Sequence, residues 1–259
     1  MAIDKEPDAY FVSDAHLGIR LAGYDDRESH LLAFLESLAG RAGRLFILGD
    51  LFDFWIEYDR FIRSDYFPTV HVLRKLTESG TDIHYLAGNH DFALGPFLTR
   101  HAGVTVHPGH VDLAVQGRRL HLYHGDGLLK ADVGYRVMKK VLRNRFNQRL
   151  FRLLHPALGL AVASFFSGAS RKFLGMLLRE WAIEEYRTVA LRYLDQGSDI
   201  VVFGHTHYPE IRTVGEKCYC NTGEWIRKYT YARMRDGVIT LWRHTPAGQD
   251  QEVAPGSLK

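Results

Sequence analysis

Five apolar runs of this 259-residue chain each end in a short polar cluster that contains Asp, Asn or His. A buried strand that ends in this way delivers polar side chains to the edge of a sheet, which is where layered α/β proteins bind their ligands. The clusters are Asp14-Ala15-His16, Gly49-Asp50 with Asp53, Gly88-Asn89-His90-Asp91, His124-Gly125-Asp126 and Gly204-His205-Thr206-His207. Their repetition predicts that several strands meet at one polar centre.

The segments between the clusters alternate between strand and helix patterns. Short buried strands are predicted at 9–13, 45–48 and 83–87, and helical apolar spacing recurs at 31–38 and 70–76 between them. A hairpin at 111–123, a buried strand at 200–203 and further short strands up to 242 follow. This order indicates a layered α/β fold in which the sheet becomes mixed after residue 103.

A largely helical insertion is predicted at about 128–195, between the His124 and His205 clusters. Residues 128–179 hold eleven Lys and Arg against one acidic residue, a net +10, whereas the whole chain carries +3. The basic character therefore belongs to this segment, and any anionic partner is expected there. We predict one domain over 1–259 in which the insertion forms a helical lid.

The composition is that of a globular protein, with 46% hydrophobic and 24% charged residues. The start of the chain lacks the pattern of a signal peptide, and no apolar run approaches the roughly 20 residues that span a bilayer. Cys218 and Cys220 would lie on one face of a strand, too close in sequence for an ordinary disulfide. A cytoplasmic protein without a membrane span is the expectation.

The polar clusters supply a mixed set of oxygen and nitrogen ligands. Such a set suits Mn, Fe, Co or Zn better than calcium, because these metals accept imidazole as well as oxygen. A carboxylate at Asp50 could bridge two ions about 3.5–4 Å apart. Any single cluster has a simpler explanation, as a turn or as a structural histidine, but five together favour metal binding. The candidate ligands are Asp14, His16, Asp50, Asn89, His124, His205 and His207.

In this order the five clusters resemble the calcineurin-like metallophosphoesterase superfamily. The resemblance implies a four-layer sandwich of two mixed β-sheets flanked by helices, with two divalent ions that activate water for attack on a phosphate ester. One ion would be held by Asp14, His16, Asp50 and His207, and the other by Asp50, Asn89, His124 and His205.

The catalytic candidates are two residues of the third cluster. His90 would lie near the phosphate and stabilise charge or protonate the leaving group. Asp91 either orients the His90 ring or is a simple turn residue. Asp53 and Asp126 are expected in structural or supporting roles.

Four short sequence segments narrow the resemblance to one branch of this superfamily. Ser13-Asp14-Ala15-His16-Leu17, Ile47-Leu48-Gly49-Asp50-Leu51-Phe52, Asp91-Phe92 and His124-Gly125-Asp126 are similar to the UDP-2,3-diacylglucosamine pyrophosphohydrolases of lipid A synthesis. That branch implies cleavage of UDP-2,3-diacylglucosamine to UMP and diacylglucosamine 1-phosphate. The substrate contacts it implies are Asn89, His90, Asp132, Tyr135, Arg171 and Lys172. One departure is His90, where typical branch members have arginine, so another phosphomonoester or phosphodiester is the alternative substrate.

The insertion combines positive charge with apolar residues, notably between 151 and 174. This combination favours an amphiphilic phosphate ester as substrate and peripheral contact with an anionic membrane. The resemblance implies that this ester is an amphiphilic nucleotide-sugar lipid and that the membrane contact is on the cytoplasmic face of the inner membrane. The alternative is a helical pair with a solvated basic face. Nucleic acid is not an expected partner, because stacking aromatics are not interleaved with the charges. The oligomeric state is left open.

Overall fold

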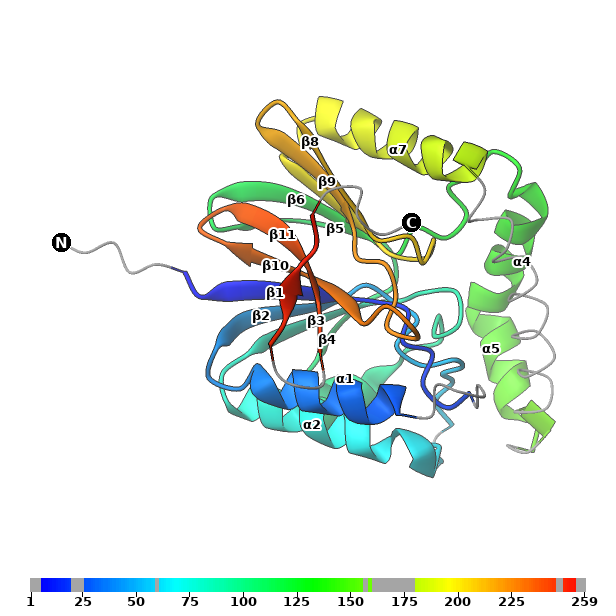
Figure 1. The fold of residues 1–259 in the computed structure, drawn as a ribbon. Coiled ribbons are helices and arrows are strands. Elements are labelled where there is room, and N and C mark those ends of the chain that lie inside the picture. Colours follow the sequence, from blue (N-terminus) through cyan, green and yellow to red (C-terminus); the bar gives the residue numbers. More distant parts are fainter. Residues whose placement is uncertain are drawn as a thin grey trace.

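The computed structural model describes residues 6–19, 26–58, 61–155, 158–159, 180–245 and 249–254. Two β-sheets pack face to face, with α1 and α2 against the outer face of one sheet and α7 against the outer face of the other (Figure 1). The predicted four-layer sandwich of two mixed sheets with flanking helices is therefore confirmed.

The larger sheet has seven strands in the order β12-β11-β10-β1-β2-β3-β4. Its parallel half joins β1 to β4, and β10 pairs antiparallel with β1, which makes the sheet mixed. The strands are β1 (Asp8–Val12), β2 (Ala42–Ile47), β3 (Asp82–Leu86), β4 (Thr105–His107), β10 (Thr230–Arg235), β11 (Val238–Arg243) and β12 (Gln251–Glu252).

The smaller sheet has five strands in the order β5-β6-β7-β9-β8. The predicted hairpin is its first antiparallel pair, and β7 lies parallel between β6 and β9. The strands are β5 (Val111–Val115), β6 (Arg118–Tyr123), β7 (Ile200–Phe203), β8 (Glu210–Val214) and β9 (Lys217–Asn221). All four residues of β7 are buried, as its unbroken apolar run predicts for a central parallel strand.

Helices connect the parallel strands and cover the outer faces. They are α1 (Arg27–Ser37), the 3-10 turn η1 (Ser64–Tyr66), α2 (Phe67–Glu78), α3 (Pro96–Ala102) and α7 (Glu180–Asp195). Leu31, Phe34 and Leu35 form the buried stripe of α1, and each such side chain stabilises the fold by about 1.5–3 kcal/mol. Between the sheets, residues from β1, β2 and β3 pack against residues from β6, β7 and β9 in a second core cluster.

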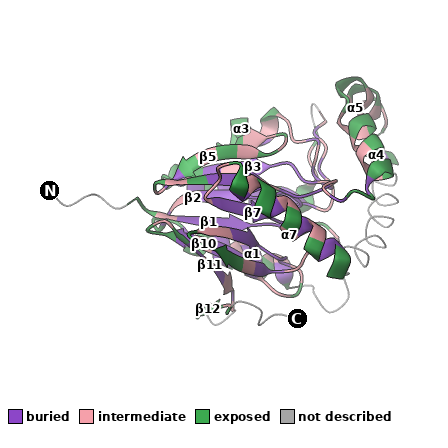
Figure 2. Cartoon of the chain, turned by 90° about the horizontal axis from the view of Figure 1, so that it is seen from above, coloured by how far each residue is buried: buried purple, intermediate pink, exposed green. Residues whose placement is uncertain are grey.

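The predicted insertion contains α4 (Val133–Arg143) and α5 (Arg145–Arg152) before α7. These two helices run beside the ends of the sheets rather than over a sheet face (Figure 1). Neither contains a buried residue, and both are drawn only in the colours of intermediate and exposed residues (Figure 2). Arg171 and Lys172, predicted to contact substrate, lie outside the described residues.

Two further expectations can be compared with the structure. Within its described part, no helix is long and apolar enough to cross a bilayer. Cys218 and Cys220 are both free thiols on β9, in agreement with their spacing.

Candidate metal centre

The predicted ligands come from the ends of strands in both sheets. Asp14 follows β1 and Asp50 follows β2 in the larger sheet, while His124 follows β6 and His205 follows β7 in the smaller one. Because β1, β2 and β3 are parallel, as are β6 and β7, their carboxyl ends gather at one end of the sandwich. Three groups of side chains there are close enough to hold a metal ion: Asp14, His16 and His207; His16, Asp50 and His90; and Asp50, His124 and His205.

The backbone is left-handed at five of these positions. The φ angle is +54° at Asp14, +46° at His16, +53° at Asp50, +65° at His205 and +54° at His207. Residues other than glycine rarely adopt this region, and such strain concentrates at functional sites. Each strand thus turns sharply as it ends, and the turn directs the side chain into the centre.

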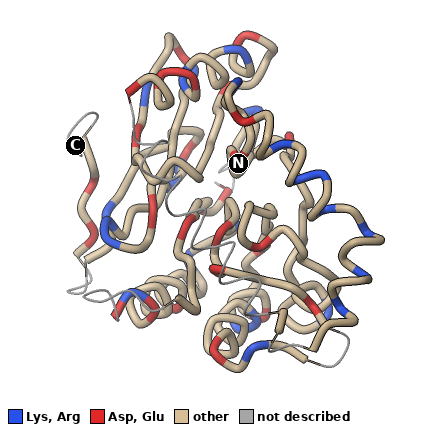
Figure 3. The backbone as a smooth tube through the Cα atoms, turned by 90° about the vertical axis from the view of Figure 1, so that its right-hand side faces the viewer, with Lys and Arg blue, Asp and Glu red and all other residues tan. Residues whose placement is uncertain are grey.

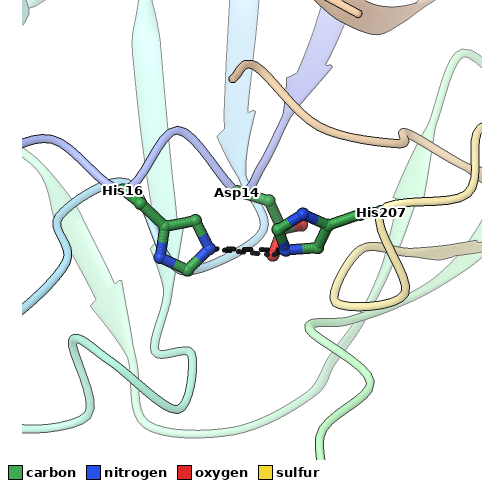
Figure 4. Close-up of side chains that lie close together, drawn as sticks. All are labelled: Asp14, His16 and His207. Atoms are coloured by element: carbon green, nitrogen blue, oxygen red, sulfur yellow. Dashed lines mark hydrogen bonds and ion pairs between the residues drawn. The ribbon is translucent and has the colours of Figure 1, made fainter. Parts of the chain in front are cut away.

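Asp14 is the middle of the first group. His207 Nε2 lies 3.3 Å and His16 Nε2 3.8 Å from its Oδ1, so both rings point toward one carboxylate oxygen (Figure 4). The other oxygen, Oδ2, accepts hydrogen bonds from the Ser13 hydroxyl and, at 2.9 Å, from the main-chain N–H of His205. One oxygen is therefore fixed by the protein, and the other faces the two imidazoles.

Asp50 lies between the two predicted ion sites. Its Oδ2 is 3.8 Å from His16 Nε2 on one side and 3.4 Å from His124 Nε2 on the other. Its Oδ1 accepts a 2.8 Å hydrogen bond from the main-chain N–H of His90. A Cβ at Gly88 would collide with Asp50 Oδ1, so this approach requires glycine. The position is the one that a bridging carboxylate needs.

The second group converges on His124. Its Nδ1 lies 2.7 Å from the carbonyl oxygen of Leu48, which fixes that nitrogen as the donor and turns Nε2 inward. Around Nε2 lie Asn89 Oδ1 at 2.9 Å and His205 Nδ1 at 3.1 Å. Asn89 thus joins this group, as the sequence predicts.

The charges of the centre explain its pKa values. Burial opposes ionisation of Asp14, but the neighbouring His207 outweighs it and lowers the pKa of Asp14 to about 2. Burial likewise opposes protonation of His124, but Asp50 outweighs it and raises the pKa of His124 to about 10. Burial and the charge of His124 lower the pKa of His205 to about 3. The lowered pKa of Asp14 and the raised pKa of His124 thus have one cause, the close approach of buried carboxylates and imidazoles.

The donor set fits a pair of divalent cations. Asp14 Oδ1 is buried and accepts no hydrogen bond of normal geometry from the described residues, although it faces two histidines. A buried carboxylate oxygen without a donor is costly unless a cation completes it. Carboxylate, amide and imidazole ligands together suit transition metals. That these side chains hold two ions stays a prediction.

His90 lies at the edge of the centre. Its ring packs edge-on against His16, with centroids 4.7 Å apart, and its Nδ1 is 2.9 Å from the main-chain oxygen of Asp53. The Asp53 carboxylate is 3.6 Å from His90 Nδ1 and 3.7 Å from His16 Nδ1. Asp53 therefore supports both rings. No local pattern distinguishes it from an ordinary turn residue, because the two histidines come from other loops.

Asp91 holds the backbone rather than the His90 ring. It accepts hydrogen bonds from the main-chain N–H groups of Gly88 at 2.8 Å and Leu51 at 2.9 Å, and from the Tyr85 hydroxyl. Burial and the charge of Asp50 raise its pKa to about 6. Through these contacts Asp91 fixes the loop that carries Asn89. The residue that contacts the His90 ring is Asp53, where the sequence suggested Asp91.

The structure changes the interpretation of the predicted substrate contacts on the insertion. The Tyr135 hydroxyl donates a 2.6 Å hydrogen bond to the buried carboxylate of Asp126, to which Lys139 Nζ also lies 2.6 Å away. Arg143 donates to the main-chain oxygen of Gly88 at 3.0 Å. The carboxylate oxygens of Asp132 are buried and accept no hydrogen bond of normal geometry from the described residues. Part of the basic charge of α4 thus attaches the helix to the metal centre.

Comparisons with known proteins agree with this geometry. Residues 9–209 match the family model described as calcineurin-like phosphoesterase. A UDP-2,3-diacylglucosamine hydrolase from Porphyromonas gingivalis is 31% identical over 243 residues, which cover 86% of this chain and 92% of that protein.

Two further relatives carry the same name. The protein from Neisseria meningitidis serogroup C is 29% identical over 230 residues, covering 88% of this chain and 94% of that protein. The protein from Haemophilus influenzae strain Rd is 28% identical over 222 residues, covering 85% and 92%. In each case the match covers more than nine tenths of the relative.

Proposed function

Because this chain belongs to the calcineurin-like phosphoesterase family, we propose that it hydrolyses the diphosphate of UDP-2,3-diacylglucosamine to UMP and diacylglucosamine 1-phosphate. The chemistry, phosphoester hydrolysis, follows from the family and from the two groups of metal ligands that share Asp50. The substrate is supported by relatives of that name, which match over 85–88% of the chain.

Two divalent ions are part of the proposal, with Mn as the first choice and Fe, Co or Zn as alternatives. Asp14, His16, Asp50 and His207 would hold one ion, and Asp50, Asn89, His124 and His205 the other. When bound, such ions would orient a phosphate, neutralise its oxygens and lower the pKa of the attacking water molecule.

The chain's own residues supply the remaining chemistry. Asn89 provides a neutral oxygen held 2.9 Å from His124, and Asp53 keeps the rings of His16 and His90 in place. His90 is the group best placed to donate a proton to the leaving oxygen, since it borders the centre without belonging to either predicted ligand set. Asp91 keeps the Asn89 loop rigid through its main-chain hydrogen bonds.

An amphiphilic substrate is supported by the surface of α4 and α5. Large apolar side chains are exposed there, including Val137 at 59%, Phe146 at 65% and Leu153 at 81%. Lys and Arg positions recur along one side of the view in Figure 3, which looks onto the end of the molecule where these helices lie. Lys140 belongs to α4, and Arg145 and Arg149 belong to α5. A lipid with an anionic headgroup fits this mixture of apolar and basic side chains.

This surface also supports peripheral binding to an anionic membrane, on the cytoplasmic face of the inner membrane. We do not assign nucleic acid as a partner, because the exposed apolar residues are mostly aliphatic and offer few stacking surfaces. Asp132, Tyr135, Arg171 and Lys172 remain candidate contacts to the substrate. For Tyr135, such contact would require exchange of its hydrogen bond to Asp126.

A second candidate is hydrolysis of another phosphomonoester or phosphodiester. It is favoured by His90, which stands where the resembled branch has arginine. Arginine binds a diphosphate through a planar fork, whereas histidine offers one ring edge and a titratable proton.

The test is incubation of purified, Mn-loaded protein with UDP-2,3-diacylglucosamine and with its deacylated form. We expect UMP from the acylated substrate and much slower release from the deacylated one. Equal rates on both substrates, or faster turnover of small soluble esters, would support the second candidate. Absence of UMP at high enzyme concentration would reject the first.

A further inference from the structure

A cleft of about 550 Å³ lies between α1 and the outer face of β1, β10 and β11. This volume is within the usual range of small-molecule sites. None of the predicted metal ligands lines it. The residues that define its chemistry are Tyr10, Arg41, Tyr231, Arg233, Trp242 and Asp250.

Strand register explains why these side chains share one face. Tyr10 of β1 pairs with Arg233 of β10, and Tyr231 of β10 pairs with Trp242 of β11. Partners in adjacent strands point to the same side, here the side that α1 covers. Phe34 of α1 completes the apolar wall, with its ring centroid 4.5 Å from that of Tyr231.

The cleft contains two arginines that form no ion pair with the described residues. The Arg233 guanidinium lies 4.1 Å above the Trp242 ring, and its Nε is buried without a hydrogen-bond partner. Arg41 is exposed, and within the described part of the chain its guanidinium makes one long contact, of 3.5 Å, to the main-chain oxygen of Ser37. A buried guanidinium nitrogen without an acceptor is unfavourable, so this arrangement favours an anionic ligand.

The acidic residue of the cleft, Asp250, already has hydrogen-bond partners within the protein. Asp250 accepts a 2.6 Å hydrogen bond from the Tyr231 hydroxyl and lies 2.9 Å from His244 Nδ1. Tyr10 is different: its side chain is 98% buried, and its hydroxyl makes no hydrogen bond with the described residues. The donors that face the cleft without an acceptor among the described residues are therefore Arg233 Nε and the Tyr10 hydroxyl, with the exposed guanidinium of Arg41 beside them. All three can donate to an anion.

We propose that this cleft binds a small organic phosphate that carries a planar ring. Arg41, Arg233 and the Tyr10 hydroxyl donate to the phosphate oxygens, as arginine forks and hydroxyl groups do at phosphate sites. The ring packs on the aromatic wall that includes Trp242 and Phe34. The site is separate from the metal centre and does not depend on the function proposed above.

The test uses two phosphonates whose C–P bond resists hydrolysis: phenylphosphonate, which has a ring, and methylphosphonate, which does not. Each is titrated into the full chain loaded with Mg²⁺, and the indole ¹H–¹⁵N signal of Trp242 is followed. Loss of the signal in Trp242→Phe identifies it. This local signal distinguishes binding in the cleft from binding at the metal centre.

We expect a saturable shift with phenylphosphonate and at least tenfold weaker binding of methylphosphonate. Arg233→Gln and Tyr10→Phe should each weaken binding tenfold or more. Arg235→Gln is the matched control, because Arg235 lies on the same strand but pairs with Asp8 at 2.6 Å and does not line the cleft. No saturable shift, or equal loss with Arg233→Gln and Arg235→Gln, overturns the proposal. Equal affinity for both phosphonates would contradict the part of the proposal that gives the ligand a planar ring.

Discussion

The main-chain N–H of His205 donates a 2.9 Å hydrogen bond to Oδ2 of Asp14, and so joins the end of β7 in one sheet to the end of β1 in the other. A Cβ at Gly204 would lie 2.8 Å from the same Oδ2, which shows how closely the two strand ends approach. The carboxylate that is predicted to bind an ion thus also aligns the two halves of the centre.

Asp14→Asn should reduce both metal content and activity. The amide can keep an acceptor toward His205 but presents an uncharged group toward His16 and His207. We expect activity to fall at least about 100-fold, with loss of one ion per chain in elemental analysis. Asp82→Asn is the control, since Asp82 is an exposed acid that pairs with Arg44 and His84. Full metal content and full activity in Asp14→Asn would show that the charge of Asp14 is not needed to hold an ion.

His90→Gln should separate catalysis from metal binding. Without a proton donor at the leaving oxygen, turnover should fall by about 10²–10⁴-fold. Metal content should stay unchanged, although His90 lies close enough to His16 and Asp50 to form a metal group. Steady-state kinetics and elemental analysis of the same preparation decide between these roles, because loss of an ion would make His90 a ligand.

Metal binding should release a proton from His124. In the ion-free fold its pKa is raised from 6.5 to about 10, so its pairing with Asp50 stabilises the fold fully below pH 6.5 and is lost as pH rises through about 10. A cation at Nε2 must displace that proton. Calorimetry at pH 8 in buffers of different ionisation enthalpy should give about one proton released per chain, and affinity should increase with pH. A pH-independent affinity between 7 and 9 would contradict this.

Tyr135→Phe should loosen α4 from the metal centre. The lost hydrogen bond runs to an ionised, buried carboxylate, and such bonds contribute about 1.5–3 kcal/mol. We expect faster hydrogen exchange in 133–143 with little change in the strands. Tyr193→Phe, in α7, is the matched control. If exchange is unchanged while KM increases, Tyr135 acts on the substrate and not on the helix.

Phe146→Glu combined with Leu153→Glu should weaken binding to anionic vesicles at least about tenfold, because each side chain loses favourable apolar transfer and gains a repelled charge. Flotation with phosphatidylglycerol vesicles measures the effect. Val238→Glu is the control, since Val238 is 63% exposed on β11, away from these helices. Binding that survives the double substitution would place the membrane surface elsewhere.

The sequence predicts the chemistry of the centre better than its supporting contacts. Asp14, Asp50 and His205 follow buried strands, so local pattern alone locates them at a sheet edge. The role of Asp53 depends on His16 and His90 meeting in space, which no short window contains. Lys139 stands beside a second lysine, Lys140, in the sequence, and nothing local shows which of the two reaches Asp126.

Several strands and helices are also difficult to predict from the sequence, because they are short or lack an apolar run. β4 has three residues, of which Thr105 is exposed, and it lacks an apolar run. α3 begins at Pro96 and spans seven residues, too few for a clear helical period. β12 is a two-residue strand that depends on pairing with β11. Such short elements form because a neighbouring strand or sheet face already exists.

The left-handed backbone at Asp14, His16, Asp50, His205 and His207 has a consequence for how this protein can change. A substitution by glycine would relieve the backbone strain at each of these turns, but it would also remove the ligand side chain. Relief of the strain at these positions therefore costs the site. Selection for stability and selection for activity therefore favour different residues at the same five positions.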